Sequence, residues 1–448
     1  MSEIIKKFYK DLFLANRLFA GIFLVVFLFI LSFFFPWLGE IPIISFFAIL
    51  ILLALDIVLL YRIEGGVFVR RSTPERLSNG DENRIDLHIE NKYTFSVFIE
   101  LIDEIPHQFQ KRDVCFHTTL QNRQSKTIDY YLRPLKRGEY DFGSIQTYVQ
   151  SPLALIKRRY TFEQPQVLAV YPSFIQMRKY ELMAISNTLV ESGIKKIRRL
   201  GHSMEFEQIR SYVPGDDFRT INWKVSARRG DLMVNTYTDE KSQHVYCVID
   251  KSRAMKMPFD GLSLLDYSIN ASLALSNVAM LKDDKAGLIT VSEKIGTILA
   301  ADRKPAQLHK ILEILYKEKT RYLEVNMEAL YSTIRFTLKQ RSLIVFFTNF
   351  ESMSALERQL PFLKKIARFH LLVIVFFENT ELKQLANEPA KDLEGIYIKT
   401  IAEKFAYEKK QIVLELARFG IQSILTSPKN LTVNTLNKYL EIKASQTI

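Results

Sequence analysis

The sequence has few cysteines and lacks several familiar catalytic signatures. Its 448 residues include only Cys115 and Cys247, with no CxxC or Cys/His spacing typical of zinc ligands. This argues against a disulfide framework and a zinc site, and it fits a reducing compartment. No GxxxxGKS/T, GxSxG or HExxH motif occurs, so nothing predicts a P-loop nucleotide hydrolase, an α/β-hydrolase or a zinc protease of those types.

Charged residues are almost missing from two long stretches near the N-terminus. Residues 18–35 carry no charge, and residues 41–61 carry only Asp56. About 20 apolar residues in a helix cross a ~30 Å hydrocarbon core, so both stretches are predicted to span a membrane as a hairpin. A cleaved signal peptide is disfavoured because the first stretch is long and the second follows at once. We expect Asp56 to reach the nearby membrane interface.

Basic residues flank this hairpin on both sides, whereas its connector carries only Glu40. The flanking residues are Lys6, Lys7, Lys10, Arg17, Arg62, Arg70 and Arg71. By the positive-inside rule, both termini and everything after residue 61 are expected in the cytoplasm. The formal net charge of +12 adds the expectation of an anionic neighbour, which composition alone leaves open between lipid, nucleic acid and an acidic protein.

Residues 62–172 are predicted to form an all-β domain. Apolar and polar residues alternate in five segments that Asn, Gly, Pro and Asp clusters separate, at 84–91, 95–103, 126–134, 143–152 and 166–172. This pattern is typical of an antiparallel, immunoglobulin-like sandwich. His107 and His117 have no partner at ligand spacing in the sequence, so we expect no metal there. The domain is interpreted as a spacer or docking surface beside the membrane.

Residues 244–448 are predicted to form an α/β domain with a parallel, Rossmann-like sheet. Apolar strands are expected at 244–250, 285–291, 342–349, 369–377 and 421–426. Helices are expected between and after them, at 263–281, 305–318, 355–367, 409–420 and from 432. Continuous apolar strands that alternate with helices indicate a sheet covered on both faces, with ligands at the carboxyl ends of its strands. Those ends lie at 249–255 and 347–352.

The segment at 212–230 joins turn residues, acids and bases. Pro214 and Gly215 predict a tight turn, after which Asp216 or Asp217 is expected to cap a helix. Apolar residues at helical spacing, with Trp223 beside them, predict a helix whose apolar face packs on the α/β domain. Residues 173–243 are therefore interpreted as a linker and signature segment that packs on that domain. A nucleic-acid interface is disfavoured because acids interrupt the basic residues. An active site built on the two aspartates lacks an adjacent histidine, metal or nucleophile.

A second basic segment lies at 191–210. It contains Lys195, Lys196, Arg198 and Arg199 between two glycines, which predicts a mobile loop. The simplest interpretation is a solvated loop. The alternative is a contact with anionic lipid head groups or with an acidic face of a protein partner, which salt would weaken.

Two motifs carry a resemblance to known families. DKSRA at 250–254 resembles the D-x-S-x-S opening of a von Willebrand factor A domain. PGDDFRTINWKVSARRGDLMV at 214–234 resembles the signature of the bacterial domain-of-unknown-function family numbered 58, whose layout covers nearly the whole chain. The resemblance implies an inner-membrane protein with a von Willebrand factor A-like α/β domain, and a MoxR-type AAA+ ATPase as partner in remodelling or maturing other proteins. The signature residues expected to bind a partner or brace the structure are Pro214, Gly215, Asp216, Asp217, Arg219, Asn222, Trp223, Ser226 and Arg228.

The resemblance also implies a divalent-metal site, from which this sequence departs. Asp250 and Ser252 match the first two motif positions, but Ala254 has no side-chain oxygen at the third. Asn349 stands where an acid is expected, and Thr320 is a counterpart for the missing threonine by position only. Because Mg²⁺ prefers close oxygen ligands and carboxylates, we expect no cofactor. Mg²⁺ at a degenerate Asp250, Ser252 and Asn349 site remains the alternative.

These observations predict a non-catalytic inner-membrane scaffold or adaptor that presents its A-like domain to a MoxR-type ATPase. Nucleic acid is not an expected partner. One alternative is a metal-dependent module that captures an acidic peptide through Asp250 and Ser252. Another is an enzyme that uses Asp216 and Asp217.

Overall fold

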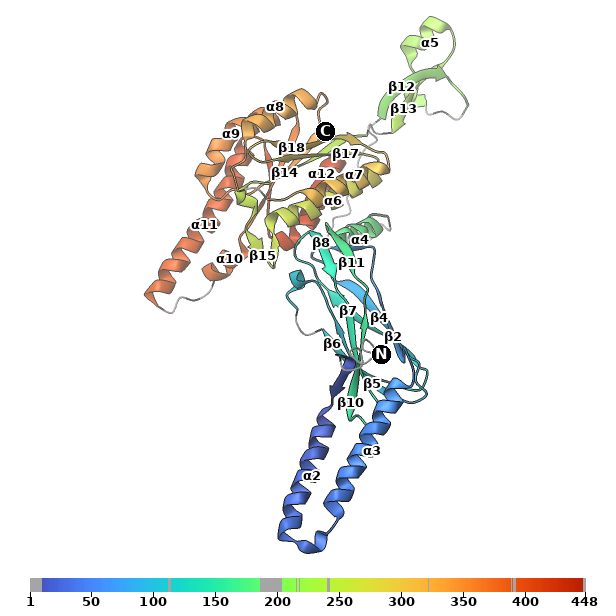
Figure 1. Cartoon of the computed structure of the whole chain (residues 1–448). Helices are drawn as coiled ribbons and strands as arrows, with labels where there is room; N and C mark the ends of the chain where they lie inside the picture. The colour runs from blue at the N-terminus through green and yellow to red at the C-terminus, as the bar shows by residue number, and fades with distance from the viewer. Residues whose placement is uncertain are drawn as a thin grey trace. The chain divides into compact units, whose positions relative to one another are not determined.

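The computed structural model describes residues 10–111, 114–185, 204–214, 216, 218–239, 242–320, 322–387, 389 and 392–445. The chain divides into two compact units, Met1–Tyr171 and Pro172–Ile448. Figure 1 shows two long helices and many strands in the first unit, and helices packed around a sheet in the second unit. The first unit contains a helical hairpin and mostly antiparallel strands, whereas the second is built on a mostly parallel sheet.

Two long apolar helices open the first unit. Helix α2 (Asn16–Phe34) and helix α3 (Ile41–Tyr61) run side by side and are joined through the short turn η1 (Pro36–Leu38). Both are long and apolar enough to cross a membrane, and most of their large side chains are exposed. Outward-facing apolar side chains on both helices are what a lipid environment requires, so the two predicted helices and their membrane association are supported.

Asp56 lies in α3 but does not extend to a membrane surface as a free side chain. It is fully buried, and its carboxylate accepts hydrogen bonds from the Ser151 hydroxyl and from the backbone N–H groups of Leu155 (3.0 Å) and Ile156 (3.1 Å). The expectation of a reach to the interface is therefore wrong. The acid instead fastens α3 to the loop at 151–156, because those buried N–H groups need an acceptor.

The carboxyl end of α3 is fixed to the strands as well. The Leu60 carbonyl accepts hydrogen bonds from the Tyr93 hydroxyl (2.7 Å) and from Arg158 Nη1 (2.5 Å), and the Ile63 carbonyl accepts from the same Arg158 nitrogen (3.1 Å). The last carbonyls of a helix have no partner within the helix, and a cation there also opposes the negative end of the helix dipole. Within this unit, hydrogen bonds thus connect helix α3 to the strands.

Strands are the main regular elements of residues 62–171, as predicted. Three sheets occur, with strand orders β2-β4-β7, β1-β10-β9-β5-β6 and β3-β11-β8. The strands in chain order are β1 (Leu12–Leu14), β2 (Val67–Ser72), β3 (Arg76–Ser78), β4 (Asn83–Asn91), β5 (Val97–Asp103), β6 (Cys115–Leu120), β7 (Ser125–Leu132), β8 (Gly138–Phe142), β9 (Ile145–Gln150), β10 (Ile156–Phe162) and β11 (Gln166–Tyr171). One apolar cluster forms their core, to which alternate residues of β4 contribute Ile85, Leu87 and Ile89. The five predicted segments correspond to β4, β5, β7, β9 and β11, whereas β1, β2, β3, β6 and β10 were not predicted.

The second unit contains a six-stranded sheet in the order β18-β17-β14-β19-β20-β21. All neighbouring strands are parallel except β18, which pairs with β17 in antiparallel fashion. The strands are β14 (His244–Asp250), β17 (Lys285–Val291), β18 (Ile295–Asp302), β19 (Leu343–Phe347), β20 (Leu371–Phe377) and β21 (Gln422–Thr426). The five predicted parallel strands are confirmed, and β18 is an additional edge strand.

Helices cover both faces of this sheet. One core cluster includes residues of α6 (Leu264–Leu281), α7 (Ala306–Lys317) and α12 (Leu431–Ala444), and α4 (Phe174–Ile185) packs against α6. The other includes residues of α8 (Met327–Thr337), α9 (Met353–Ala367) and α11 (Leu393–Arg418). Helices α4, α8 and α10 (Thr380–Asn387) were not predicted, and α11 begins at Leu393 instead of residue 409. Exposed apolar side chains early in α11 obscure its helical period.

A two-stranded hairpin carries the signature segment. Strand β12 (Met204–Ser211) pairs with β13 (Met233–Asp239), and η4 (Phe218–Thr220) and α5 (Trp223–Arg229) lie between them. Residues 204–210 were predicted as part of a mobile loop, which is wrong because they form a paired strand. Lys195, Lys196, Arg198 and Arg199 lie outside the described residues.

Candidate functional site

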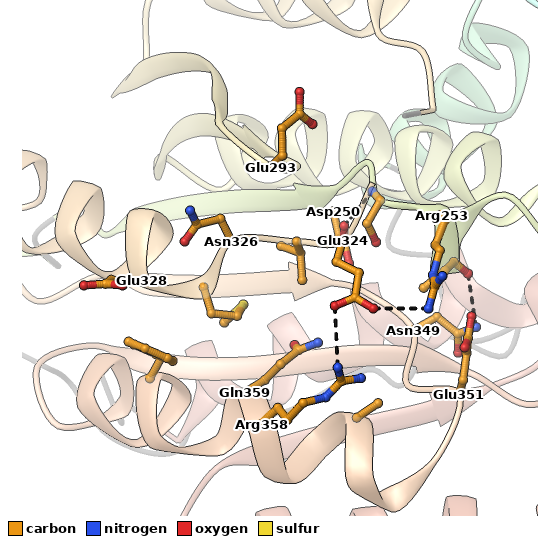
Figure 2. Close-up of a pocket in the computed structure, with 16 residues that line it drawn as sticks. Asp250, Arg253, Glu293, Glu324, Asn326, Glu328, Asn349, Glu351, Arg358 and Gln359 are labelled. Carbon is orange, nitrogen blue, oxygen red and sulfur yellow. Dashed lines mark hydrogen bonds and ion pairs between the residues drawn. The ribbon is translucent and has the colours of Figure 1, made fainter. Parts of the chain in front are cut away.

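A cavity of about 470 Å³ lies at the carboxyl ends of β14 and β19. Parallel strands end at the same edge of a sheet, which is where ligands of such folds bind. Figure 2 shows side chains from the ends of these strands, from α9 and from the segment that leads into α8. The lining consists of Asp250, Ser252, Arg253, Ala254, Glu293, Glu324, Val325, Asn326, Met327, Glu328, Asn349, Glu351, Ala355, Arg358, Gln359 and Phe362.

Asp250 is the last residue of β14 and is buried at the base of the cavity. One carboxylate oxygen accepts a hydrogen bond from the Ser252 backbone N–H (2.8 Å), and the other accepts from the Thr348 hydroxyl (2.7 Å). Burial raises the pKa of Asp250 above its ordinary value, while these hydrogen bonds oppose that shift. The carboxylate therefore already serves as an acceptor that orders the loop after β14.

Asn349 follows β19 and lines the same cavity, but its oxygen is already engaged. Its amide nitrogen donates to the Ala254 carbonyl (3.3 Å), and its oxygen accepts from the Lys409 ammonium (2.9 Å). Lys409 comes from α11 and also donates to the Phe350 carbonyl. Burial lowers the pKa of Lys409 to about 8, so most of this ammonium keeps its charge at neutral pH. A metal ion bound to the Asn349 oxygen would have to displace it.

The three predicted metal ligands thus line one cavity, but the further oxygen ligands expected at Thr320 and at position 254 are not provided by side chains there. Asp250, Ser252 and Asn349 all line the cavity, whereas Thr320 does not belong to its lining. Ala254 offers only its backbone carbonyl, which accepts from Asn349. The sequence could not indicate Lys409, because it lies 60 residues beyond Asn349 and reaches the site from a helix whose first half was not predicted.

The cavity has an acidic lining that no sequence motif indicated. Five carboxyl side chains and two guanidinium groups line it, and Glu324 pairs with both Arg253 (3.1 Å) and Arg358 (3.6 Å). These pairs are visible in Figure 2. Because the acids come from separate segments around residues 293, 324, 328 and 351, no single stretch of sequence reveals them. An excess of carboxylates favours a cationic ligand over an anionic one.

A buried ion pair supports the residue after Asp250. The Lys251 ammonium lies 2.6 Å from a carboxylate oxygen of Glu318, whose other oxygen accepts from the Thr290 hydroxyl (2.9 Å). Gly296 leaves room for this pair, since a Cβ atom there would lie 2.8 Å from the Lys251 nitrogen. Charged groups removed from water need such complete pairing. The pair fixes the start of the loop that lines the cavity.

Asp216 braces a turn in the signature segment and does not cap a helix. Arg210 donates to both of its carboxylate oxygens (2.8 and 2.6 Å), and the Val213 backbone N–H donates to one of them (3.0 Å). The hydrogen bond from Arg210 lowers the pKa of Asp216 below its ordinary value. The predicted cap is therefore wrong for Asp216. Gly215 and Asp217 lie outside the described residues.

Asn222 caps α5 instead. Its side-chain oxygen accepts from the Val225 backbone N–H (3.2 Å), and its side-chain nitrogen donates to Asn235 (2.9 Å) on β13. The Ser226 hydroxyl donates to the Asn222 carbonyl (2.8 Å) and accepts from the Met233 backbone N–H (2.9 Å). Asn222 thus caps α5, and asparagine is a favoured residue at that position. Together, Asn222 and Ser226 also connect α5 to β13.

The other signature residues present exposed side chains. Trp223 is 69% exposed and Phe218 is 70% exposed, which differs from the expected packing of Trp223 onto the α/β domain. Arg219 lies over the Phe218 ring, and Arg228 lies in the last turn of α5, where a cation suits the helix dipole. Pro214 is in the exposed turn before Asp216. This part of the segment offers an aromatic and basic surface.

Residues 208–384 match a protein-family model described as "Protein of unknown function DUF58". These residues belong to the DUF58 family. The DUF58 segment begins in β12 and ends in α10, so it includes the signature, strands β14 to β20 and the cavity. The resemblance of the signature at 214–234 to this family is therefore confirmed.

Similar proteins add little about activity. The "Uncharacterized protein YeaD" of Bacillus subtilis (strain 168) is 33% identical over 129 residues, which are 29% of this chain and 32% of that protein. The matched stretch thus spans about a third of the relative's length. Among solved structures, the conserved hypothetical protein BatB from Bacteroides thetaiotaomicron is 14% identical, with a TM-score of 0.29 over 46% of this chain and 100% of that chain. A PapD-like domain of human CEP192 is 15% identical, with a TM-score of 0.18 over 23% of this chain and 84% of that chain. Scores this low assign no fold.

Proposed function

We propose that this protein is a non-catalytic, membrane-attached adaptor that binds a protein partner through its α/β unit. The observation that carries the proposal is an uncovered apolar surface on helices α10 and α11, here called the hairpin surface. Its members are exposed by between 39% and 86% of their area, and they are Leu385, Leu393, Ile396, Tyr397, Ile398, Ile401 and Phe405. Soluble surfaces rarely gather so many large apolar side chains unless something binds there.

The geometry of α11 explains why this surface is uncovered. The helix has 26 residues, and its buried positions are Ala402, Ile412 and Leu416. A helix of that length extends about 39 Å at 1.5 Å per residue, and the two positions that join the core cluster over the sheet, Ile412 and Leu416, lie in its second half. Figure 1 shows its first half and α10 continuing beyond the sheet within this unit. A helical pair that carries apolar side chains past its own core is suited to a groove or helix face on another protein.

Charge favours a protein partner over a lipid surface at this position. Residues 380–405 contain five acids and four lysines, which leaves no basic excess. Helices that lie on anionic membranes are typically rich in Lys and Arg on their polar face. Tyrosine and large aliphatic side chains beside mixed charges are instead typical of a protein interface, where aromatic residues contribute much of the affinity.

The partner that the family resemblance implies is a MoxR-type AAA+ ATPase, and we adopt it as the proposed partner. The resemblance and the basic residues that flank both apolar helices support an inner membrane location with the α/β unit in the cytoplasm. The protein would then hold the ATPase at the membrane without turning over a substrate of its own. The von Willebrand factor A-like nature of the α/β unit is part of this proposal.

We further propose that binding needs no divalent metal. The Lys409 ammonium on the Asn349 oxygen and the missing hydroxyl at Ala254 support this view. An acidic peptide would not suit the carboxylate-rich cavity, which weakens the alternative of metal-dependent capture through Asp250 and Ser252. The enzyme alternative loses support as well, because Asp216 is held by Arg210 in a turn.

The test uses the full chain in lipid nanodiscs and a purified MoxR-type ATPase from the same organism. Tyr397→Glu and Leu393→Glu each place a charge on the hairpin surface, and we expect affinity to fall at least about 30-fold, as for loss of an interface hot spot. Phe336→Glu is the matched control, because Phe336 is 81% exposed on α8, away from the hairpin surface. Equal affinity for wild type and both hairpin variants would refute the proposal.

A further inference from the structure

Three metal-binding residue types meet on one face of the β sheet in the first unit. Strands β5 and β6 are antiparallel, with Glu100 directly opposite His117 and Ile102 opposite Cys115. Side chains alternate between the two faces of a strand, so Cys115 and His117, two residues apart, share a face. Directly opposite residues of a pair also share a face, which brings Glu100 to the same place. Register, not sequence proximity, assembles this group.

The distances among the three side chains are somewhat longer than those between the ligands of a tetrahedral metal. Cys115 Sγ lies 3.8 Å from Glu100 Oε1 and 3.8 Å from His117 Nε2. All three ligand atoms lie within 4.8 Å of one another. Zinc bonds of about 2.3 Å to sulfur and 2.0–2.2 Å to nitrogen and oxygen give separations of about 3.3–3.6 Å between tetrahedral ligands. Small side-chain rotations therefore suffice to close the group around an ion.

Neighbouring residues already hold two of the ligands in place. The Lys157 ammonium lies 2.7 Å from Glu100 Oε2, which leaves Oε1 directed toward the cysteine. The His117 ring stacks on Phe98, with ring centroids 6.0 Å apart and planes 15° apart. Partners of this kind orient metal ligands and reduce the entropy lost when an ion binds. Cys115 and His117 are exposed, so an ion can enter from solvent.

We propose that Glu100, Cys115 and His117 form a zinc-binding site with one coordination position open to solvent. A thiolate and an imidazole select zinc over Mg²⁺ or Ca²⁺, which prefer oxygen ligands. On binding, the Cys115 thiol releases its proton to solvent, and the remaining position takes water or a group from another molecule. The site lies on the first unit and is independent of the hairpin surface and the proposed adaptor role.

The test is metal binding by the full chain in detergent, with Co²⁺ as a spectroscopic substitute for zinc. One equivalent of Co²⁺ should produce a thiolate-to-cobalt charge-transfer band in the near ultraviolet, and Zn²⁺ should abolish that band. Cys115→Ser should remove the band. His117→Ala and Glu100→Gln should each weaken zinc binding at least about 10-fold in competition with a chelator.

His107→Ala and Cys247→Ala are the controls, because His107 is exposed outside the group and Cys247 is the other, buried thiol. Both should bind metal as wild type does. The proposal is overturned if wild type shows no thiolate band at stoichiometric Co²⁺, or if the band survives Cys115→Ser. Unchanged zinc affinity in both His117→Ala and Glu100→Gln would overturn it too.

Discussion

Breaking the buried Lys251–Glu318 ion pair should be strongly destabilising. Glu318→Gln keeps the size of the side chain but leaves the Lys251 ammonium without its counter-charge, and Lys251→Met leaves the Glu318 carboxylate without its cation. Both side chains are at most 10% exposed, so solvent screens their interaction little. Removing one partner of such a pair costs about 3–5 kcal/mol.

That loss has a measurable consequence in thermal unfolding. For a unit of this size, each kcal/mol lowers the Tm by about 2–4 °C, so each single variant should lower the Tm of the α/β unit by roughly 6–20 °C. The double variant Lys251→Met/Glu318→Leu replaces both charges by apolar groups and should be more stable than either single variant. Arg253→Met is the matched control, because its pair with Glu324 at 3.1 Å is more than half exposed and contributes about 1 kcal/mol or less.

The assay is thermal unfolding of the detergent-solubilised chain. Hydrogen exchange in β14 and β17 assigns the transition to the α/β unit, because several units unfold in one protein. Single variants with a Tm within about 3 °C of wild type would refute the reasoning. A double variant less stable than both singles would refute it as well.

Three further predictions concern other charged groups. Asp56→Leu removes the acceptor of the Leu155 and Ile156 N–H groups, so these amides should exchange faster by the equivalent of about 1–3 kcal/mol, and unchanged exchange would contradict the role of Asp56. Burial lowers the pKa of His370 below its ordinary 6.5, so the unfolded chain binds more protons there, and stability should fall as pH drops below about 6.5, by at most about 1.4 kcal/mol per pH unit. His370→Gln should flatten that dependence, and an unchanged slope would contradict it. Titration calorimetry of Mg²⁺ into the full chain should show no micromolar binding, whereas such binding lost in Asp250→Ala would restore the metal-dependent alternative.

Periodicity in the sequence predicted the framework of the fold. Residue patterns that a single element displays on its own predicted the two apolar helices, five strands of the β-rich region and all five parallel strands of the second unit. The edge of the sheet that holds the cavity was also predictable, because Asp250 ends one buried strand and Asn349 follows another. Features that depend on one segment at a time were thus accessible.

Features that depend on two distant segments were not accessible from those patterns. Asp216 and Asn222 are both good helix caps by residue type, and only the position of Arg210 on β12 commits Asp216 to the turn. Similarly, the sequence shows only that Asp56 lies in an apolar helix. Its hydrogen-bond donors lie far away in the sequence, in the loop at 151–156. The sequence did not indicate Cys115 and His117 as metal ligands, because Glu100 comes close to them only through the pairing of strands β5 and β6.

The most direct test of the adaptor proposal is hydrogen exchange of the full chain in nanodiscs, with and without the MoxR-type ATPase. The account predicts slower exchange over α10 and the first half of α11, at residues 380–405, and little change around α8. Unchanged exchange over 380–405 while the ATPase is bound would contradict the central claim that this surface is where the protein engages its partner.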